Sequence, residues 1–156
     1  MYIKSCCFSG HRQIFHSGVS KRLKQVIGSL VGAGVHTFYS GGMGEFDHLA
    51  ESVVRDFQRT QQEIQLFLVI AYPTRDLNLQ KEYYERAYNG ILYPLELVGI
   101  HPKSAIQRRN QWMVDHSGYL AAFVTREFGG AFRTLRYAQK KNLDIFNIAD
   151  MQGVSK

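Results

Sequence analysis

Apolar runs typical of β-strands alternate with amphipathic segments along almost the whole chain, and this alternation constrains the fold most. Residues 64–71 form a nearly continuous apolar run, as expected for a strand covered on both faces. Residues 19–31 carry apolar side chains at helical spacing. The alternation predicts an α/β fold with a mainly parallel sheet and helices on both faces. We expect strands at 2–8, 35–40, 64–71, 94–100, 119–125 and 144–148, and helices at 19–31, 46–59, 103–116 and 131–141, with a helix and a loop within 77–93.

The length and composition predict one domain that spans residues 1–156. The chain has 156 residues, of which 45% are hydrophobic, enough for a sizeable core. Its N-terminus lacks the layout of a signal peptide, and no apolar run is long enough to cross a membrane. Cys6 and Cys7 are adjacent, so in a strand they point to opposite faces and cannot form a disulfide framework. These features predict a cytoplasmic protein.

The formal net charge of +6 favours a partner that carries phosphate, either a nucleotide or a nucleic acid. Most basic residues are scattered, which is also the pattern of an ordinary solvated surface. No basic stripe with interleaved aromatic residues is evident, so nucleic acid is the less favoured partner.

The segment 37–47 reads as a strand, a glycine turn and the first residues of a helix. Gly41, Gly42 and Gly44 lack a Cβ atom, which lets a ligand approach the main chain. Backbone N–H groups and the helix dipole at such a turn favour an anion. The alternative is a tight connection between strand and helix with no ligand.

Two further turns follow expected strands. Ser9, Gly10, His11 and Arg12 supply a hydroxyl, a flexible backbone and side chains that can bind an anion. The segment 129–134 repeats the glycine turn before a helix, with arginine and threonine side chains in its first turn. In a parallel sheet the turns after the strands open on one edge, which is where ligands bind in such folds.

Two carboxylates lie at the start of the second expected helix. Glu45 and Asp47 can both stabilise a helix N-terminus, and capping explains at least one of them. Asp47 is the one that we place in the site, either on a ligand hydroxyl or as a general acid or base. The histidines and cysteines show no metal-ligand spacing, so we expect neither a metal nor a cofactor.

Four short motifs, in this order and spacing, resemble the SLOG superfamily, and they cover the chain from Cys6 to Ile148. They are Cys-Cys-Phe-Ser-Gly-His-Arg at 6–12, Gly-Gly-Met-Gly-Glu-Phe-Asp at 41–47, Arg-Asn-Gln-Trp-Met-Val-Asp at 109–115 and Gly-Gly-Ala-Phe-Arg-Thr at 129–134. The superfamily includes the Lonely Guy phosphoribohydrolases and the DprA/Smf DNA-processing proteins. The chain is most similar to its small bacterial members.

The resemblance implies a Rossmann-like three-layer sandwich, a nucleotide or nucleotide-derived ligand at the glycine turns, and a homodimer. In the phosphoribohydrolases an arginine acts with a glutamate, and Arg109 matches that arginine. The PGGxGTxxE pattern becomes Phe-Gly-Gly-Ala-Phe-Arg-Thr-Leu-Arg-Tyr at 128–137, without the proline, the third glycine or the acid. Asp47 or Glu45 would have to replace that glutamate.

Three functions therefore remain open. The first is binding of a nucleotide-derived small ligand, by a sensor or by a protein that processes the ligand. The second is N-glycosidic hydrolysis of a nucleoside monophosphate, with Arg109, Asp47 and Glu45 as candidate catalytic residues. The third is DprA-like binding of single-stranded DNA. The predicted ligand-binding residues are Ser9, Gly10, His11, Arg12, Gly41, Gly42, Met43, Gly44, Asp47, Arg109, Asn110, Gly129, Gly130, Ala131, Arg133 and Thr134.

Overall fold

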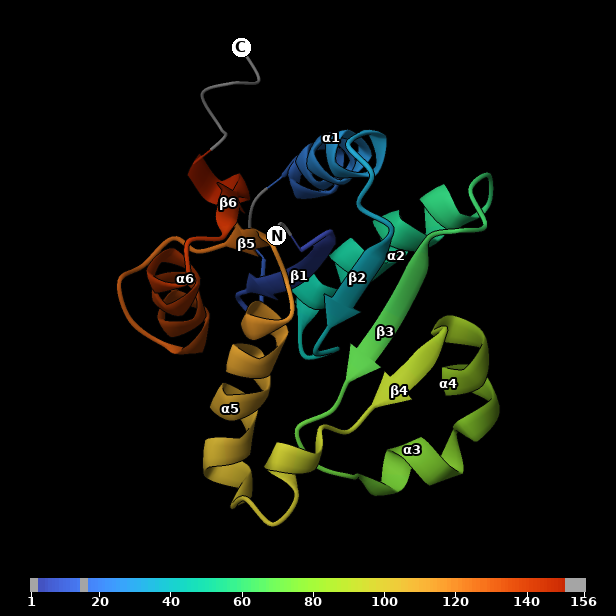
Figure 1. Ribbon diagram of the computed structural model, residues 1–156, viewed down its shortest axis with the longest axis vertical. Coiled ribbons are helices and arrows are strands. Elements are labelled where there is room, and N and C mark those ends of the chain that lie inside the picture. Colours follow the sequence, from blue (N-terminus) through green and yellow to red (C-terminus); the bar gives the residue numbers. More distant parts are fainter. Residues whose placement is uncertain (1–2, 15–16, 151–156) are drawn as a thin grey trace.

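A computed structural model describes residues 3–14 and 17–150 and shows six strands in a single parallel sheet with helices on both faces (Figure 1). The fold class that the alternation predicts is confirmed. The elements in chain order are β1 (Ser5–Gly10), α1 (Val19–Gly32), β2 (Thr37–Ser40), α2 (Glu45–Gln58), β3 (Gln65–Val69), α3 (Arg75–Leu79), α4 (Lys81–Ala87), β4 (Gly90–Leu92), the 3-10 helix η1 (Leu95–Leu97), α5 (Pro102–Asp115), β5 (Tyr119–Phe123), α6 (Gly130–Lys140) and β6 (Asp144–Asn147).

The strand order is β4-β3-β2-β1-β5-β6, with β1 paired in parallel to both β2 and β5. The chain therefore builds the sheet outward from β1 in one direction and then in the other. The order reverses between β1 and β5, which is the point where open parallel sheets leave a crevice beyond the carboxyl ends of the strands.

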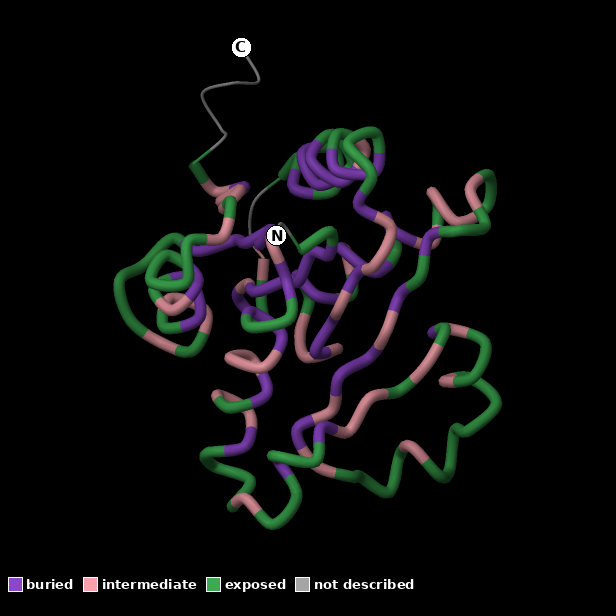
Figure 2. Tube along the Cα trace, viewed as in Figure 1, coloured by how far each residue is buried: buried purple, intermediate pink, exposed green. Residues whose placement is uncertain are grey.

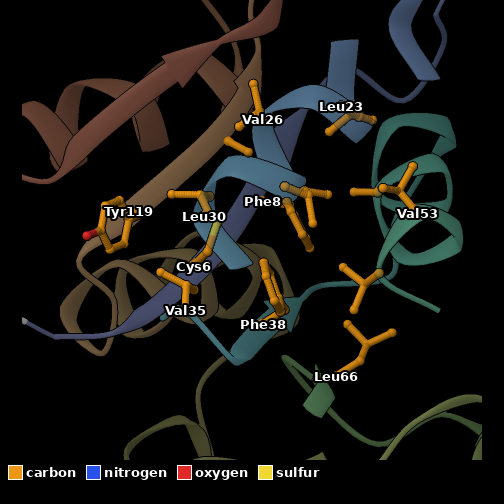
Figure 3. Packing of buried hydrophobic residues seen from close by; sticks show 14 of the residues in the cluster. Cys6, Phe8, Leu23, Val26, Leu30, Val35, Phe38, Val53, Leu66 and Tyr119 are labelled. Carbon is orange, nitrogen blue, oxygen red and sulfur yellow. The ribbon is translucent and has the colours of Figure 1, made fainter. Parts of the chain in front are cut away.

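Two apolar clusters fill the space between the sheet and the helix layers. The first packs α1 and α2 against one face of the sheet, with Phe8 and Phe38 stacked 6.0 Å apart at its centre (Figure 3). The second packs α5 and α6 against the other face. Figure 2 shows the buried positions along the central strands and on the inner sides of the helices. Cys6 belongs to the first cluster and Cys7 to the second, so the prediction that they point to opposite faces is confirmed.

Both cysteines are free thiols and fully buried. Burial raises the pKa of the Cys7 thiol to about 12 and the pKa of Cys6 well above its ordinary value. Neither thiol is therefore a thiolate nucleophile at neutral pH.

The segment 77–100 differs from the prediction. The expected helix within 77–93 is two short helices, α3 and α4, and the strand expected at 94–100 lies earlier, at Gly90–Leu92. The carbonyl of Leu92 accepts the N–H of Ile70, and the chain then leaves the sheet. Pro94 has no N–H to extend the ladder, and the apolar residues after it form η1 instead.

Within the described residues no helix has both the length and the apolar character that a membrane span requires. The first predicted strand begins at Tyr2, which lies outside the residues that the structure describes.

Candidate functional site

A cavity of about 700 Å³ lies beyond the carboxyl ends of β1 and β5, where the strand order reverses. The loops after β1 and β5, the start of α6 and one side of α5 form its walls. Figure 1 shows α5 and α6 side by side on the face of the sheet opposite α1 and α2. The lining residues are Phe8, Ser9, Gly10, His11, Arg12, Gln13, Met43, Asp47, Lys103, Ile106, Gln107, Arg109, Asn110, Phe123, Thr125, Arg126, Gly130, Ala131 and Arg133.

His11 joins the loops after β1 and β5 across this cavity. The main-chain N–H of His11 donates to the carbonyl of Phe123 at 3.3 Å, and the ring Nε2 atom accepts the main-chain N–H of Thr125 at 3.0 Å. The ring is almost fully buried and packs edge-on against Phe123. His11 therefore fixes the relative position of the two loops. The sequence indicates only that its side chain can bind an anion, and does not reveal this structural role.

Three N–H groups in and next to the first glycine turn already have protein partners. Gly42 donates to Ser40 Oγ at 3.0 Å, Met43 to Asp47 Oδ2 at 3.0 Å, and Glu45 to the carbonyl of Arg12 at 2.9 Å. Gly42 and Met43 therefore have no main-chain donor left for a ligand. The interpretation of the turn as an anion cradle is therefore wrong for the N–H groups of these two residues.

Gly41 instead makes room for the side chain of Arg109. A Cβ atom on Gly41 would lie 2.8 Å from the Cζ atom of Arg109, closer than such atoms can approach. The Nη1 group of Arg109 donates to the carbonyls of Gly41 at 3.2 Å and Val69 at 3.0 Å. Its Nε donates to Asn110 Oδ1 at 2.8 Å, and its Nη2 contacts Met43 Sδ at 3.2 Å. The guanidinium is thus held at the ends of β2 and β3, with only a weak sulfur acceptor at Nη2.

A buried network of hydrogen bonds around Glu51 stabilises the first glycine turn. Glu51 is 1% exposed and accepts hydrogen bonds from Ser40 Oγ at 2.6 Å and from the Tyr88 hydroxyl at 2.8 Å. Because Ser40 Oγ in turn accepts the N–H of Gly42, the carboxylate of Glu51 fixes the conformation of the turn. Arg55 contacts the same carboxylate at 3.4 Å.

Of the two carboxylates proposed for the site, only Asp47 lines the cavity. Glu45 is exposed and accepts the N–H of Ile14 at 3.1 Å, so it serves the loop after β1. Hydrolysis would therefore depend on Asp47 alone. Burial raises the pKa of Asp47 to about 7, against the opposing effects of the Met43 N–H and Arg109. Burial also lowers the pKa of Arg109.

We expect Asp47→Asn to raise the free energy of unfolding, relative to the wild type, more at pH 8 than at pH 5. The difference between the two pH values should be on the order of 2 kcal/mol. The folded pKa of Asp47, about 7, lies above the unfolded value, so the folded state binds the extra proton. Wild-type stability from this group therefore falls as pH rises between about 4 and 7. Asparagine removes this loss and can still accept the Met43 N–H. Chemical denaturation at the two pH values measures the difference; equal differences at both would contradict the raised pKa.

The second glycine turn leads into α6, whose first residues line the cavity. Gly129 precedes α6 without a side-chain cap, and the first N–H groups of an α-helix have no partner within the helix. Gly130, Ala131 and Arg133 line the cavity beside them. Thr134 is 1% exposed and donates its hydroxyl to the carbonyl of Gly130 at 3.0 Å, so it supports the turn from inside.

Five cationic side chains line the cavity and face one carboxylate, Asp47. Among the residues that the structure describes, none of the five has a carboxylate within ion-pair distance. An unpaired cluster of this kind favours an anionic ligand. The five cationic residues are Arg12, Lys103, Arg109, Arg126 and Arg133.

The structure thus brings together most of the predicted residues and adds others. Arg126 directly follows the strand predicted at 119–125, so its place was a usable signal, whereas nothing in the sequence marks Lys103. Among the described residues no group of three or more His, Cys, Asp or Glu is arranged to hold a metal ion. Predicted residues on the cavity wall are Ser9, Gly10, His11, Arg12, Met43, Asp47, Arg109, Asn110, Gly130, Ala131 and Arg133; those outside it are Gly41, Gly42, Gly44, Glu45, Gly129 and Thr134.

Solved structures with a similar fold include two DNA processing proteins. DNA processing protein A from Helicobacter pylori, in a structure concerned with its single-stranded DNA binding mode, superposes with a TM-score of 0.64 at 19% identity. DprA from Streptococcus pneumoniae superposes with a TM-score of 0.63 at 18% identity. Both alignments cover 92% of this chain but only 64% and 49% of those chains.

No family model and no curated protein sequence matches the chain. The structural matches show that the chain shares its fold with these DNA processing proteins. The closer likeness to small bacterial members stays a prediction.

Proposed function

We propose that the protein binds a nucleotide or nucleotide-derived ligand in the cavity between the loops after β1 and β5. The observation that carries this proposal is the set of five cations without carboxylate partners around a cavity at the strand-order reversal. A volume of about 700 Å³ is in the range of small-ligand sites. The five cations outnumber the one carboxylate, Asp47, and this excess of positive charge favours a ligand with at least one phosphate.

The phosphate has a natural place at the start of α6. The first N–H groups of α6 have no partner within the helix, and Gly130 and Ala131 line the cavity together with Arg126 and Arg133. Asp47 lines the same cavity, and its carboxylate interacts with the charges of Arg109 and Arg12. Because its pKa is about 7, Asp47 can accept a hydrogen bond from a ribose hydroxyl or donate one to a ligand oxygen.

Single-stranded DNA is the second candidate, and the similarity to the DNA processing proteins favours it. Phe128 adds a local observation, because it is 66% exposed beside the cavity and the Arg126 guanidinium lies 5.0 Å from its ring centroid. An exposed aromatic ring beside arginines is a platform on which a base can stack.

Equilibrium binding of AMP, ADP-ribose and a thymidine oligonucleotide, at about 50 mM and about 200 mM salt, separates the two candidates. A mononucleotide site should bind AMP or ADP-ribose in preference to the oligonucleotide, with little change between the two salt concentrations. A strand-binding surface should prefer the oligonucleotide and lose at least about tenfold in affinity at the higher salt. Binding of none of these ligands would contradict both candidates.

We expect Arg133→Gln to weaken binding of AMP by about tenfold, because it removes a charge-assisted hydrogen bond to phosphate. Arg136→Gln is the matched control, since Arg136 is an exposed residue of the same helix that does not line the cavity. Equal losses in both variants would indicate that only the overall charge matters.

Phe128→Ala should weaken oligonucleotide binding by about fivefold or more and leave AMP binding within about twofold. The ring is exposed and lies outside the cavity lining, so its loss should not disturb the fold. Unchanged oligonucleotide binding in this variant would remove the local argument for a strand-binding surface.

A further inference from the structure

A second, smaller cavity lies on the other side of Met43 and Arg109. It has a volume of about 180 Å³ and lies at the ends of β2 and β3, against α3 and α4. Figure 1 shows α3 and α4 beside β4 at one edge of the sheet. The lining residues are Gly41, Gly42, Met43, His48, Leu68, Ile70, Ala71, Tyr72, Thr74, Leu77, Tyr83, Tyr84, Tyr88 and Arg109.

The walls of this cavity are aromatic and aliphatic, in contrast to the basic cavity. Tyr84 and Tyr88 lie nearly parallel, with ring centroids 6.2 Å apart, and Tyr83 packs edge-on against Tyr84. The hydroxyl of Tyr88 donates to Glu51 at 2.8 Å and that of Tyr84 to Asp76 at 2.6 Å. Since both hydroxyls donate to carboxylates of the protein, Tyr84 and Tyr88 present mainly the carbon atoms of their rings to a ligand. The same hydrogen bonds fix the positions of the two rings.

Part of this wall lies outside the protein core, although Tyr88 belongs to the first apolar cluster and Tyr84 packs against that cluster. Neither α3 nor α4 contains a buried residue, and Tyr83 is 49% exposed. Packing in the core therefore accounts for Tyr88 and Tyr84 but gives no reason for an aromatic ring at Tyr83. An open, tyrosine-lined space of this size suits a single planar ring system, which stacks well on aromatic faces.

Met43 and Arg109 are the residues that line both cavities. The Nη2 group of Arg109 faces Met43, where sulfur is its acceptor. Methionine side chains adapt easily, and a sulfur acceptor is readily exchanged for a stronger one. A ligand with phosphate in the basic cavity could therefore extend past Met43 into the second cavity and take a hydrogen bond from Arg109 on the way.

We propose that the tyrosine-lined cavity is the subsite for the base of the nucleotide-type ligand whose phosphate lies in the basic cavity. This inference rests on the proposed function, because it takes the phosphate position from it. It adds that the ligand carries a planar aromatic ring, and that this ring contributes to affinity through Tyr83 and its neighbours.

The test compares AMP with ribose 5-phosphate, which has the phosphate and sugar but no base. For the wild-type protein AMP should bind about fivefold or more tightly than ribose 5-phosphate, the gain typical of one stacked base. Tyr83→Ala should remove most of that gain and leave ribose 5-phosphate binding unchanged. Tyr83→Phe keeps the ring and should retain the gain within about twofold. Both variants change an exposed side chain and should fold normally.

A blocking variant gives an independent readout. Thr74 is exposed and lines the cavity, so Thr74→Trp should place a large ring in the space and reduce AMP binding to the level of ribose 5-phosphate. Equal affinities of AMP and ribose 5-phosphate for the wild type, or equal losses of both ligands in Tyr83→Ala, would overturn the subsite and leave the proposed function standing. Failure of both ligands to bind the wild type would overturn the proposed function and this inference with it.

Discussion

Replacing Arg109 with methionine should weaken nucleotide binding by at least about 30-fold, the largest functional effect that we expect from a single substitution. Arg109 is 3% exposed, lines both cavities and has no carboxylate partner among the described residues. Because Arg109 is buried, its replacement would leave a phosphate beside it without a counter-charge. Calorimetric titration with AMP or ADP-ribose measures the loss.

The same substitution should change the free energy of unfolding by less than about 2 kcal/mol, because two effects oppose each other. The carbonyls of Gly41 and Val69 lose a donor, which costs about 1–3 kcal/mol each when they stay buried. Methionine, however, avoids the burial of a charge without an ion partner, which is itself unfavourable. Arg108→Met is the control, since Arg108 is exposed and lines neither cavity. Equal binding losses in both variants would contradict a specific role for Arg109.

Gly44→Ala should lower the free energy of unfolding by about 2–5 kcal/mol, the largest stability effect that we expect. Gly44 has a φ of +103°, and a Cβ atom there would lie 2.6 Å from the Cα atom of Arg12. That neighbour is main chain, held by the hydrogen bond from Glu45 N–H to the carbonyl of Arg12, and cannot move aside cheaply. Urea denaturation followed by circular dichroism measures the change.

Gly32→Ala is the matched control for this prediction. Gly32 lies within α1, has no positive φ, and a Cβ atom there would meet nothing within 4 Å. Alanine should therefore stabilise this helix by about 0.5–1 kcal/mol. If both substitutions destabilised the protein equally, the close approach of the two loops at Gly44 would be wrong.

The layers of the fold follow from the sequence because each strand and helix carries its own local pattern. The run at 64–71 and the helical spacing at 19–31 need no distant information, and both elements are present. The strand order does not follow in this way, since it depends on which strands pair across the sheet. The segment after Leu77 was predicted poorly because its helices are short, bury no residue and lack the periodic pattern of a core helix.

The glycine turns show why a site is harder to predict than a fold. In the sequence Gly41, Gly42 and Gly44 are typical of a ligand-binding turn. The sequence cannot distinguish a glycine that makes room for a ligand from one that makes room for the side chain of another residue. Gly41 accommodates Arg109, which is 68 positions away in the chain. Asp47 lines the cavity, because a carboxylate in the first turn of α2 points back toward the turn that precedes the helix.

An NMR titration of the isotope-labelled protein with AMP tests the central claim most directly, since amide shifts report the position of the ligand residue by residue. The account predicts that the largest shifts fall on the end of β1 and the loop after it, at 9–13, and on the start of α6, at 130–133, with saturation at one equivalent. Shifts confined to other surfaces, or no shifts at ligand concentrations up to about 1 mM, where even weak binding would register, would contradict a nucleotide site between β1 and β5.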